Sequence, residues 1–153
     1  MKEKISVVMT TYNGEKYLLE QLESLRNQTL KIDEVIIMDD CSKDETPKLI
    51  RKYIADNNLN GWKLIENQTN QGWKKNFKLG FDLVTGDYIF PCDQDDIWHL
   101  DKVQRMTECM KKHPEIELLA ANYMTFFSEN DTGSGSKLYA ARSKEMKSDG
   151  SVE

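Results

Sequence analysis

Short apolar runs alternate with segments of helical periodicity from Lys4 to about Met124. The runs at Ile5–Thr10 and Val35–Met38 are mostly apolar, as expected of strands that are covered on both faces. Between them, leucines recur at helical spacing from Glu15 to Gln28. Connections of one helix each favour a parallel sheet with helices on both faces. The alternation therefore predicts an α/β fold, a three-layer α/β/α sandwich with a mostly parallel central sheet.

The later elements repeat this order. Thr46-Pro47 offers a capping hydroxyl followed by a proline at the first helical position. We expect Trp73 and Trp98 to belong to the core. Further strands are predicted at Trp62–Ile65, Tyr88–Phe90 and Leu118–Ala121, and further helices at Trp73–Val84 and around Val103, Met106 and Met110. The side chains that we expect to be buried in central strands are Val7, Val8, Ile36, Ile37, Ile89 and Phe90.

The periodic pattern ends near Phe127. Residues 130–136 have the composition of a linker, and the chain stays polar from there to Glu153. A length of 153 residues leaves room for one hydrophobic core. We therefore expect residues 1–127 to form one domain. Residues 128–153 are either a polar tail or the beginning of a region whose partner strands are missing.

Composition excludes several classes of protein. The net charge is −5, with no basic stretch that could follow a phosphate backbone, so nucleic acid is not an expected partner. No apolar run approaches the roughly 20 residues that span a bilayer, and the first strand begins too early for a signal peptide. The three cysteines lack C-x-x-C spacing, which argues against a disulfide framework and against zinc. The expected compartment is the cytoplasm.

Three aspartates, Asp93, Asp95 and Asp96, stand within four residues, directly after a predicted strand. Clustered like charges raise some pKa values or demand a cation. A divalent cation with oxygen ligands is the simple remedy, and it can join protein carboxylates to a diphosphate. The alternative is a solvated acidic loop in which Asp96 or Asp101 caps the next helix. The position between a buried strand and a helix favours the cation site.

Two other strand ends are polar and, in a parallel sheet, should lie on the same edge as the aspartates. Asp40 could accept a hydrogen bond from a base ring N–H, although aspartate after a strand commonly forms a turn. Tyr12 could stack on a base, or it could be an ordinary surface tyrosine. Lys74 and Lys75 open a helix, where cations are unfavourable with the helix dipole. That misfit suits anion binding, but lysine pairs are usually just solvated.

Taken together, these segments resemble family-2 glycosyltransferases with the GT-A fold. The resemblance covers roughly Ile5 to Met124, and its motifs are specific jointly rather than singly. The motif Asp-Gln-Asp-Asp-Ile-Trp is similar to that of a branch of the family that includes many rhamnosyltransferase-like enzymes of bacterial surface polysaccharide synthesis. The segments that carry the resemblance are Val7–Asn13, Val35–Thr46, Asn70-Gln71-Gly72 with Asn76, Gly86–Phe90, Asp93–Trp98 and Asp101-Lys102.

The resemblance implies a role for individual residues. Thr10 and Tyr12 match positions that line the nucleotide pocket, and Asp40 matches the carboxylate that reads the base. Lys75 stands near a basic position that approaches the diphosphate in relatives. Asp93 matches the first aspartate of the D-x-D motif, near the ribose and the metal.

Asp95 matches the residue that binds Mg²⁺ or Mn²⁺, with Asp93 beside it. The family's general base is a carboxylate well beyond the D-x-D motif. None of the carboxylates near Glu153 has a convincing setting, so the base is unknown. We expect it to lie beyond Glu153, with residues 128–153 at most beginning the acceptor half.

The resemblance implies a glycosyltransferase that binds a nucleoside-diphosphate sugar through a divalent metal. An inverting transfer would deliver the sugar to the hydroxyl of a saccharide or lipid-linked acceptor, in cell-surface polysaccharide synthesis. The alternatives are a nucleotide-sugar-binding module without transfer activity, and a plain α/β interaction domain. Peripheral attachment to the inner face of a membrane, through parts outside this chain, also stays open.

Overall fold

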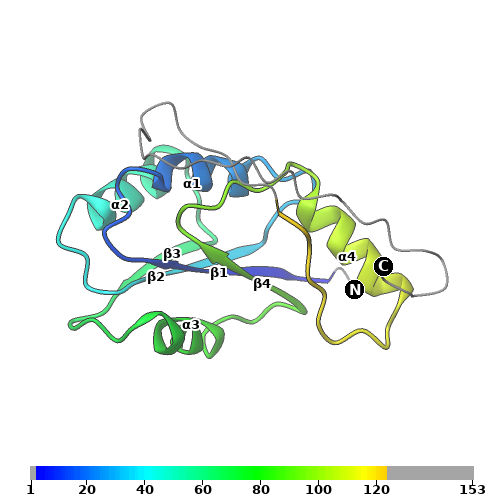
Figure 1. The fold of residues 1–153 in the computed structure, drawn as a ribbon. Coiled ribbons are helices and arrows are strands. Elements are labelled where there is room, and N and C mark those ends of the chain that lie inside the picture. Colours follow the sequence, from blue (N-terminus) through cyan, green and yellow to red (C-terminus); the bar gives the residue numbers. More distant parts are fainter. Residues whose placement is uncertain (1–2, 124–153) are drawn as a thin grey trace, which may run out of the picture. The chain divides into compact units, whose positions relative to one another are not determined.

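A parallel four-stranded sheet organises the chain, and the computed structural model describes residues 3–123 (Figure 1). The strands are β1 (Ile5–Thr11), β2 (Glu34–Asp39), β3 (Trp62–Glu66) and β4 (Tyr88–Asp93), in the spatial order β3-β2-β1-β4. All three strand pairings are parallel. The predicted α/β architecture with a parallel central sheet is confirmed.

Helices cover both faces of this sheet, as Figure 1 shows. The helices α1 (Leu18–Arg26) and α2 (Thr46–Asp56) lie on one face, and α3 (Trp73–Phe81) lies on the other. The last helix, α4 (Lys102–Lys112), places Val103 in the same hydrophobic core as Leu22 of α1. Three connections of one helix each, through α1, α2 and α3, therefore build the layers that the alternating pattern predicted.

The strand pattern decides which side chains meet which helices. Val7 and Val35 face each other in register and join the core beneath α1 and α2. Their neighbours Val8 and Ile36 point to the opposite face, because successive side chains of a strand alternate. There α3 approaches so closely that a Cβ at Gly80 would lie 2.4 Å from Cγ1 of Val8. The central strands β1 and β2 are buried on both faces for this reason.

Three sequence expectations about burial and strands are wrong. Ile89 is 44% exposed, because β4 stands at the edge of the described sheet and α3 contacts β1 and β2 instead. Trp73 is 67% exposed at the first turn of α3 and is not part of the core. Leu118–Ala121 is not a strand, because a short run becomes a strand only where another strand pairs with it. The other expected core residues and Trp98 are buried.

The sheet and its helices form one compact unit, Met1–Pro114, and a second unit begins at Glu115. The expected domain boundary at residue 127 and the expected polar segment 128–153 lie outside the described residues. Both stay predictions. Cys92 is buried, while Cys41 and Cys109 are partly buried free thiols.

Within residues 3–123, no helix combines the length and the apolar character needed to cross a lipid bilayer.

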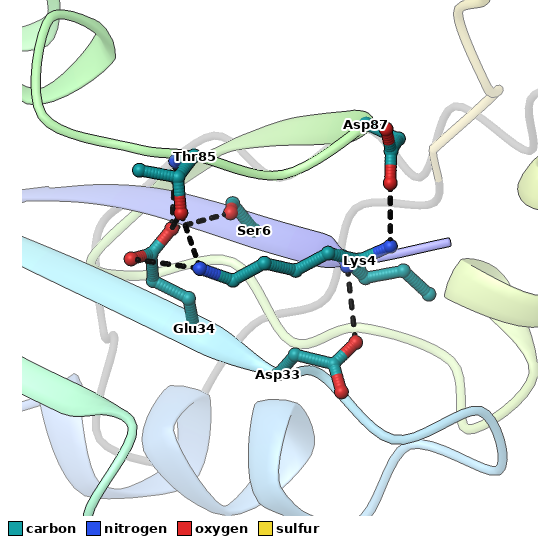
Figure 2. A network of polar contacts seen from close by, with 7 residues as sticks. Lys4, Ser6, Asp33, Glu34, Thr85 and Asp87 are labelled. Atoms are coloured by element: carbon teal, nitrogen blue, oxygen red, sulfur yellow. Dashed lines mark hydrogen bonds and ion pairs between the residues drawn. The ribbon is translucent and has the colours of Figure 1, made fainter. Parts of the chain in front are cut away.

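A polar network ties three strands together at the edge of the sheet where they begin (Figure 2). Glu34 is buried, and its Oε2 accepts hydrogen bonds from Oγ of Ser6 at 2.6 Å and from the backbone N–H of Thr85 at 2.9 Å. The ammonium of Lys4 lies 3.3 Å from the other carboxylate oxygen. The backbone N–H of Lys4 donates to Asp87 at 2.7 Å. These contacts fix the starts of β1, β2 and β4 relative to one another.

Candidate functional site

A cleft of about 290 Å³ opens at the edge of the sheet where the parallel strands end. Its walls come from the ends of β1, β2 and β4 and from the loop that leads into α3. The residues that line it are Thr10, Thr11, Tyr12, Asp40, Asn70, Gly72, Trp73, Asn76, Asp93, Gln94 and Asp95. The structure thus brings together every proposed nucleotide-binding or metal-binding residue except Lys75.

The register of the sheet explains this grouping. Thr10 of β1 pairs with Asp93 of β4 on one side and with Met38 of β2 on the other. Strands that run parallel and in step end at one edge, so the polar residues that follow them meet there. Asp40 and Asp93 are distant in sequence, yet each stands next to the end of β1. The roles proposed for them remain predictions.

Asp40 has a structural task that the sequence did not predict. It is buried, and its Oδ1 accepts hydrogen bonds from the backbone N–H of Gln71 at 2.7 Å and from Nδ2 of Asn67 at 2.9 Å. Its Oδ2 accepts the backbone N–H of Gly72 at 2.9 Å. Gly72 has a φ of +79°, a backbone conformation that glycine adopts without steric cost. Asp40 therefore shapes the turn that starts α3 as well as lining the cleft.

The loops after β1 and β2 are joined by several hydrogen bonds beside the cleft. The backbone N–H of Asn13 donates to Oγ of Ser42 at 2.9 Å, and the side-chain Oδ1 of Asn13 accepts from the backbone N–H of Lys43 at 2.8 Å. The N–H of Gly14 donates to Oγ1 of Thr46 at 2.8 Å. Tyr12, at the start of the first loop, is 47% exposed. Its ring is available at the mouth of the cleft.

The acidic segment places three carboxylates close together beside the cleft. Partial burial raises the pKa of Asp93, and repulsion from Asp96 and then Asp95 raises it further. Among residues 3–123, no lysine or arginine forms an ion pair with any of these three carboxylates. Asp93 and Asp95 line the cleft, whereas Asp96 lines a neighbouring groove. Carboxylate oxygens are the donors that Mg²⁺ and Mn²⁺ prefer.

The part of the chain that the structure describes holds no group of three or more acidic, histidine or cysteine side chains placed to bind a metal by themselves. A cation at Asp93 and Asp95 would therefore need further oxygen ligands from a diphosphate and water. This fits Mg²⁺, which is usually held by one or two carboxylates together with substrate phosphates.

Lys75 lies outside the cleft, and its ammonium donates to Oε1 of Gln71. Trp73, in contrast, lines both the cleft and a second groove of about 460 Å³ between α3 and β4. Lys74 lines that second groove as well. From the sequence, Trp73 was expected in the core, like Trp98, and this expectation is wrong because the side chain is 67% exposed. The exposed ring sits where the two hollows meet.

Asp101 stands apart from the acidic segment. It occupies the position before α4, and its Oδ1 lies 2.7 Å from Nδ1 of His99. Trp98 is buried against Phe90, at 6.0 Å between ring centroids. Asp101 therefore lies at the start of a helix, and Trp98 lies in the core.

For two residues at or beside the cleft, the sequence did not indicate the contacts that they make. Nδ2 of Asn67 donates hydrogen bonds to Oδ1 of Asp40 at 2.9 Å and to Oδ1 of Asn76 at 2.8 Å. Gln94 stands between two aspartates and pairs with the backbone of Tyr12, 82 positions earlier in the chain. Amides have no distinctive pattern along a sequence. Their partners are set by strand order, which only the folded chain shows.

Solved structures share this architecture. Residues 1–349 of TarS from Staphylococcus aureus, in complex with UDP-GlcNAc, match with a TM-score of 0.66 and 30% identity over 72% of this chain and 32% of that one. The mannosyltransferase PcManGT of Pyrobaculum calidifontis, in complex with GDP-Man and Mn²⁺, gives a TM-score of 0.67 over 72% of this chain and 33% of that one. At 22% identity, the second match supports the fold alone.

Relatives in sequence agree. EpsE of Bacillus subtilis is 32% identical over 123 residues, which are 80% of this chain and 44% of EpsE. The poly(ribitol-phosphate) beta-N-acetylglucosaminyltransferase TarS of Staphylococcus aureus is 32% identical over 118 residues, which are 76% of this chain and 20% of TarS. The chain therefore spans less than half the length of either relative. The sequence profile described as "Glycosyl transferase family 2" matches residues 6–150. With that match and the GT-A fold of its structural neighbours, the chain belongs to glycosyl transferase family 2.

Proposed function

We propose that this chain is the nucleotide-sugar-binding part of a glycosyltransferase that holds its donor through a divalent metal. The observation that carries the proposal is the single cleft that gathers Tyr12, Asp40, Asp93 and Asp95 at the carboxyl edge of the sheet. In parallel α/β sheets, ligands bind at this edge. Family membership supports sugar transfer as the chemistry, and the TarS complexes with UDP and UDP-GlcNAc support a nucleoside-diphosphate sugar as the donor.

Each part of the cleft has a task in this proposal. The exposed ring of Tyr12 offers a face on which a base can stack. One further lone pair of Asp40 can accept a base N–H beside the backbone N–H groups that it already holds. Asp93 and Asp95 would hold Mg²⁺ or Mn²⁺. When bound, that cation would stabilise the negative charge of the leaving diphosphate.

The finer parts of the function rest on the family resemblance. We propose that transfer proceeds with inversion, by attack of an acceptor hydroxyl of a saccharide or lipid-linked molecule. A carboxylate outside the described residues would remove the proton of that hydroxyl. We also propose a place in cell-surface polysaccharide synthesis, acting in the cytoplasm. The name of TarS, a poly(ribitol-phosphate) beta-N-acetylglucosaminyltransferase, supports the class of polymer and carries no information on the compartment. Lys75 remains a candidate for binding the diphosphate. Its side chain is long, so its ammonium could give up the contact with Gln71 and reach a phosphate instead.

Calorimetry tests the proposal. UDP and GDP are titrated into the chain with and without Mn²⁺ or Mg²⁺. We expect one nucleotide to bind, and to bind more tightly with metal, because the cation replaces repulsion between diphosphate and carboxylates with attraction. Equal affinity with and without metal would contradict the proposed site. Hydrolysis or transfer of a UDP-sugar would then separate an enzyme from a binding module without transfer activity.

A further inference from the structure

One side chain bridges the two loops that face each other across the cleft. The backbone N–H of Tyr12 donates to Oε1 of Gln94 at 2.8 Å, and Nε2 of Gln94 donates to the backbone carbonyl of Tyr12 at 3.1 Å. The amide of Gln94 thus pairs with both polar groups of one residue, as a neighbouring strand would. Tyr12 belongs to the loop after β1, and Gln94 stands between Asp93 and Asp95 in the loop after β4.

At neutral pH, the carboxamide of glutamine offers the donor and the acceptor that this pair of contacts needs. A backbone N–H can only donate and a carbonyl can only accept, so the partner must offer one acceptor and one donor. Glutamate would leave the carbonyl of Tyr12 facing a carboxylate. An apolar side chain would leave both backbone groups without a protein partner. The two contacts also determine which end of the amide carries the oxygen.

The neighbouring loop leaves room for this amide. A Cβ at Gly14 would lie 2.2 Å from Oε1 and 2.5 Å from Cδ of Gln94. Real Cβ atoms do not approach so closely, so any larger residue at position 14 would displace the amide or the loop. The φ of Gly14 is not in the left-handed region, which makes space, and not backbone conformation, the reason for glycine here.

We propose that Gln94 is a positioning residue that couples nucleotide binding to metal binding, an inference that rests on the proposed function. Its amide fixes the Tyr12 backbone, which carries the ring at the mouth of the cleft. Its own backbone separates Asp93 from Asp95, the two cleft carboxylates. Ordering of the acidic segment by a cation therefore also orders the Tyr12 loop, and a base stacked on Tyr12 favours the carboxylate arrangement that the cation needs. Coupling of this kind is reciprocal.

The test compares UDP affinity with and without Mn²⁺ in three single variants and one double variant of the full chain. The coupling ratio is the dissociation constant of UDP without Mn²⁺ divided by that with Mn²⁺. We expect Gln94→Ala to reduce this ratio by about 5-fold or more, the low end of typical coupling between two sites. Gln104→Ala is the matched control, because its amide pairs with Thr29 and Glu108 away from the cleft. That control should keep the ratio of the unmodified chain.

Gly14→Ala provides an independent route to the same result. Its new Cβ displaces the amide, so this variant should also lose coupling. When Gln94 is already alanine, the Cβ of Gly14→Ala no longer meets an amide. The double variant should therefore lose no more coupling than Gln94→Ala alone, so the effects of the two substitutions are not additive. Circular dichroism of each variant without ligand reports whether the fold is retained. If Gln94→Ala does not fold, Gly14→Ala carries the test.

Two outcomes would overturn the inference while leaving the proposed function intact. In the first, Gln94→Ala keeps the full coupling ratio. In the second, it weakens UDP binding equally with and without Mn²⁺, as a purely structural residue would. If the unmodified chain binds neither UDP nor GDP more tightly with Mn²⁺, the proposed function itself is wrong, and the inference is wrong with it.

Discussion

Oγ of Ser6 lies 2.6 Å from Oε2 of Glu34, and the two residues stand side by side in register on β1 and β2. The same carboxylate oxygen accepts the backbone N–H of Thr85, three residues before β4 begins. One buried side chain therefore joins three strands at the edge of the sheet opposite the cleft. It fixes the start of β4 relative to β1 and β2. Because Asp93 is the last residue of β4, it thereby also helps to position Asp93.

We expect Glu34→Gln to lower the free energy of unfolding at pH 7 by about 1–3 kcal/mol, because an amide cannot replace the charged acceptor in all its contacts. Burial by itself raises the pKa of Glu34. Hydrogen bonds from Ser6, Thr85 and Lys4 outweigh burial and hold the pKa below its usual value. A lowered pKa in the folded state stabilises the protein above the unfolded-state pKa, and this contribution is lost as the pH falls through the folded-state value.

Urea unfolding of both proteins at pH 7 and at a series of pH values below about 4 measures this contribution. The difference in the free energy of unfolding between the two proteins should shrink as the pH falls. Glu45→Gln is the control, since Glu45 is exposed and pairs with Lys48 at the surface. A difference that stays constant over the whole pH range would contradict the role of the Glu34 charge.

We expect Asp40→Asn to loosen the turn at Gln71 and Gly72. The carboxylate accepts N–H groups at both oxygens, so an asparagine must turn its NH₂ group toward at least one donor. The unmatched donor pair should cost about 1–3 kcal/mol of stability. Hydrogen exchange should speed up at the amides of Gln71 and Gly72 more than in the central strands. Asp82→Asn, at an exposed pair with Lys78, is the control; unchanged exchange at both turn amides would show that Asp40 does not hold them.

We expect Asp95→Asn to remove most of the difference in nucleotide affinity that Mn²⁺ produces. Asparagine keeps the shape of the side chain and deletes one charged ligand from a site that offers two carboxylates to the cleft. The loss in metal-dependent affinity should be at least about 10–100-fold, the range measured for weaker changes around metal ligands. Calorimetry with UDP, with and without Mn²⁺, gives the four affinities that are needed.

The control for this prediction is Asp101→Asn. Asp101 stands at the start of α4, where it contacts His99 and lies outside the residues that line the cleft. Its substitution should leave the metal dependence unchanged. An effect as large as that of Asp95→Asn would mean that the ligands are assigned to the wrong aspartates.

We expect Gly80→Ala to destabilise the protein by about 1–3 kcal/mol, although alanine favours helices. The new Cβ would meet Cγ1 of Val8 at 2.4 Å and Cγ of Met38 at 3.0 Å, so α3 would have to move away from the sheet. Val8→Ala removes one of these obstacles. The double variant should therefore lose less stability than the sum of the two single variants, as measured by thermal unfolding. Strict additivity would show that α3 does not press on Val8.

The sequence by itself determined the layers and the edge at which the site lies. Apolar runs such as Val35–Met38, separated by amphipathic helices, allow few arrangements other than a parallel sheet. Once the strands are parallel, Thr10, Asp40 and Asp93 must gather at the edge where their strands end. Local patterns suffice for this much, because hydrophobic periodicity and the handedness of crossover connections act along the chain.

Tertiary structure alone decided which polar groups meet and which face of an edge strand is covered. Ile89 has the same apolar character as Ile36, yet it is exposed, because α3 packs over β1 and β2 and not over β4. Gln94 and Tyr12 pair across 82 residues, and Asp40 holds a turn 31 residues away. An amide or carboxylate accepts any suitable donor, so its partner depends on strand order and register. Those are properties of the folded sheet, and no local stretch of sequence contains them.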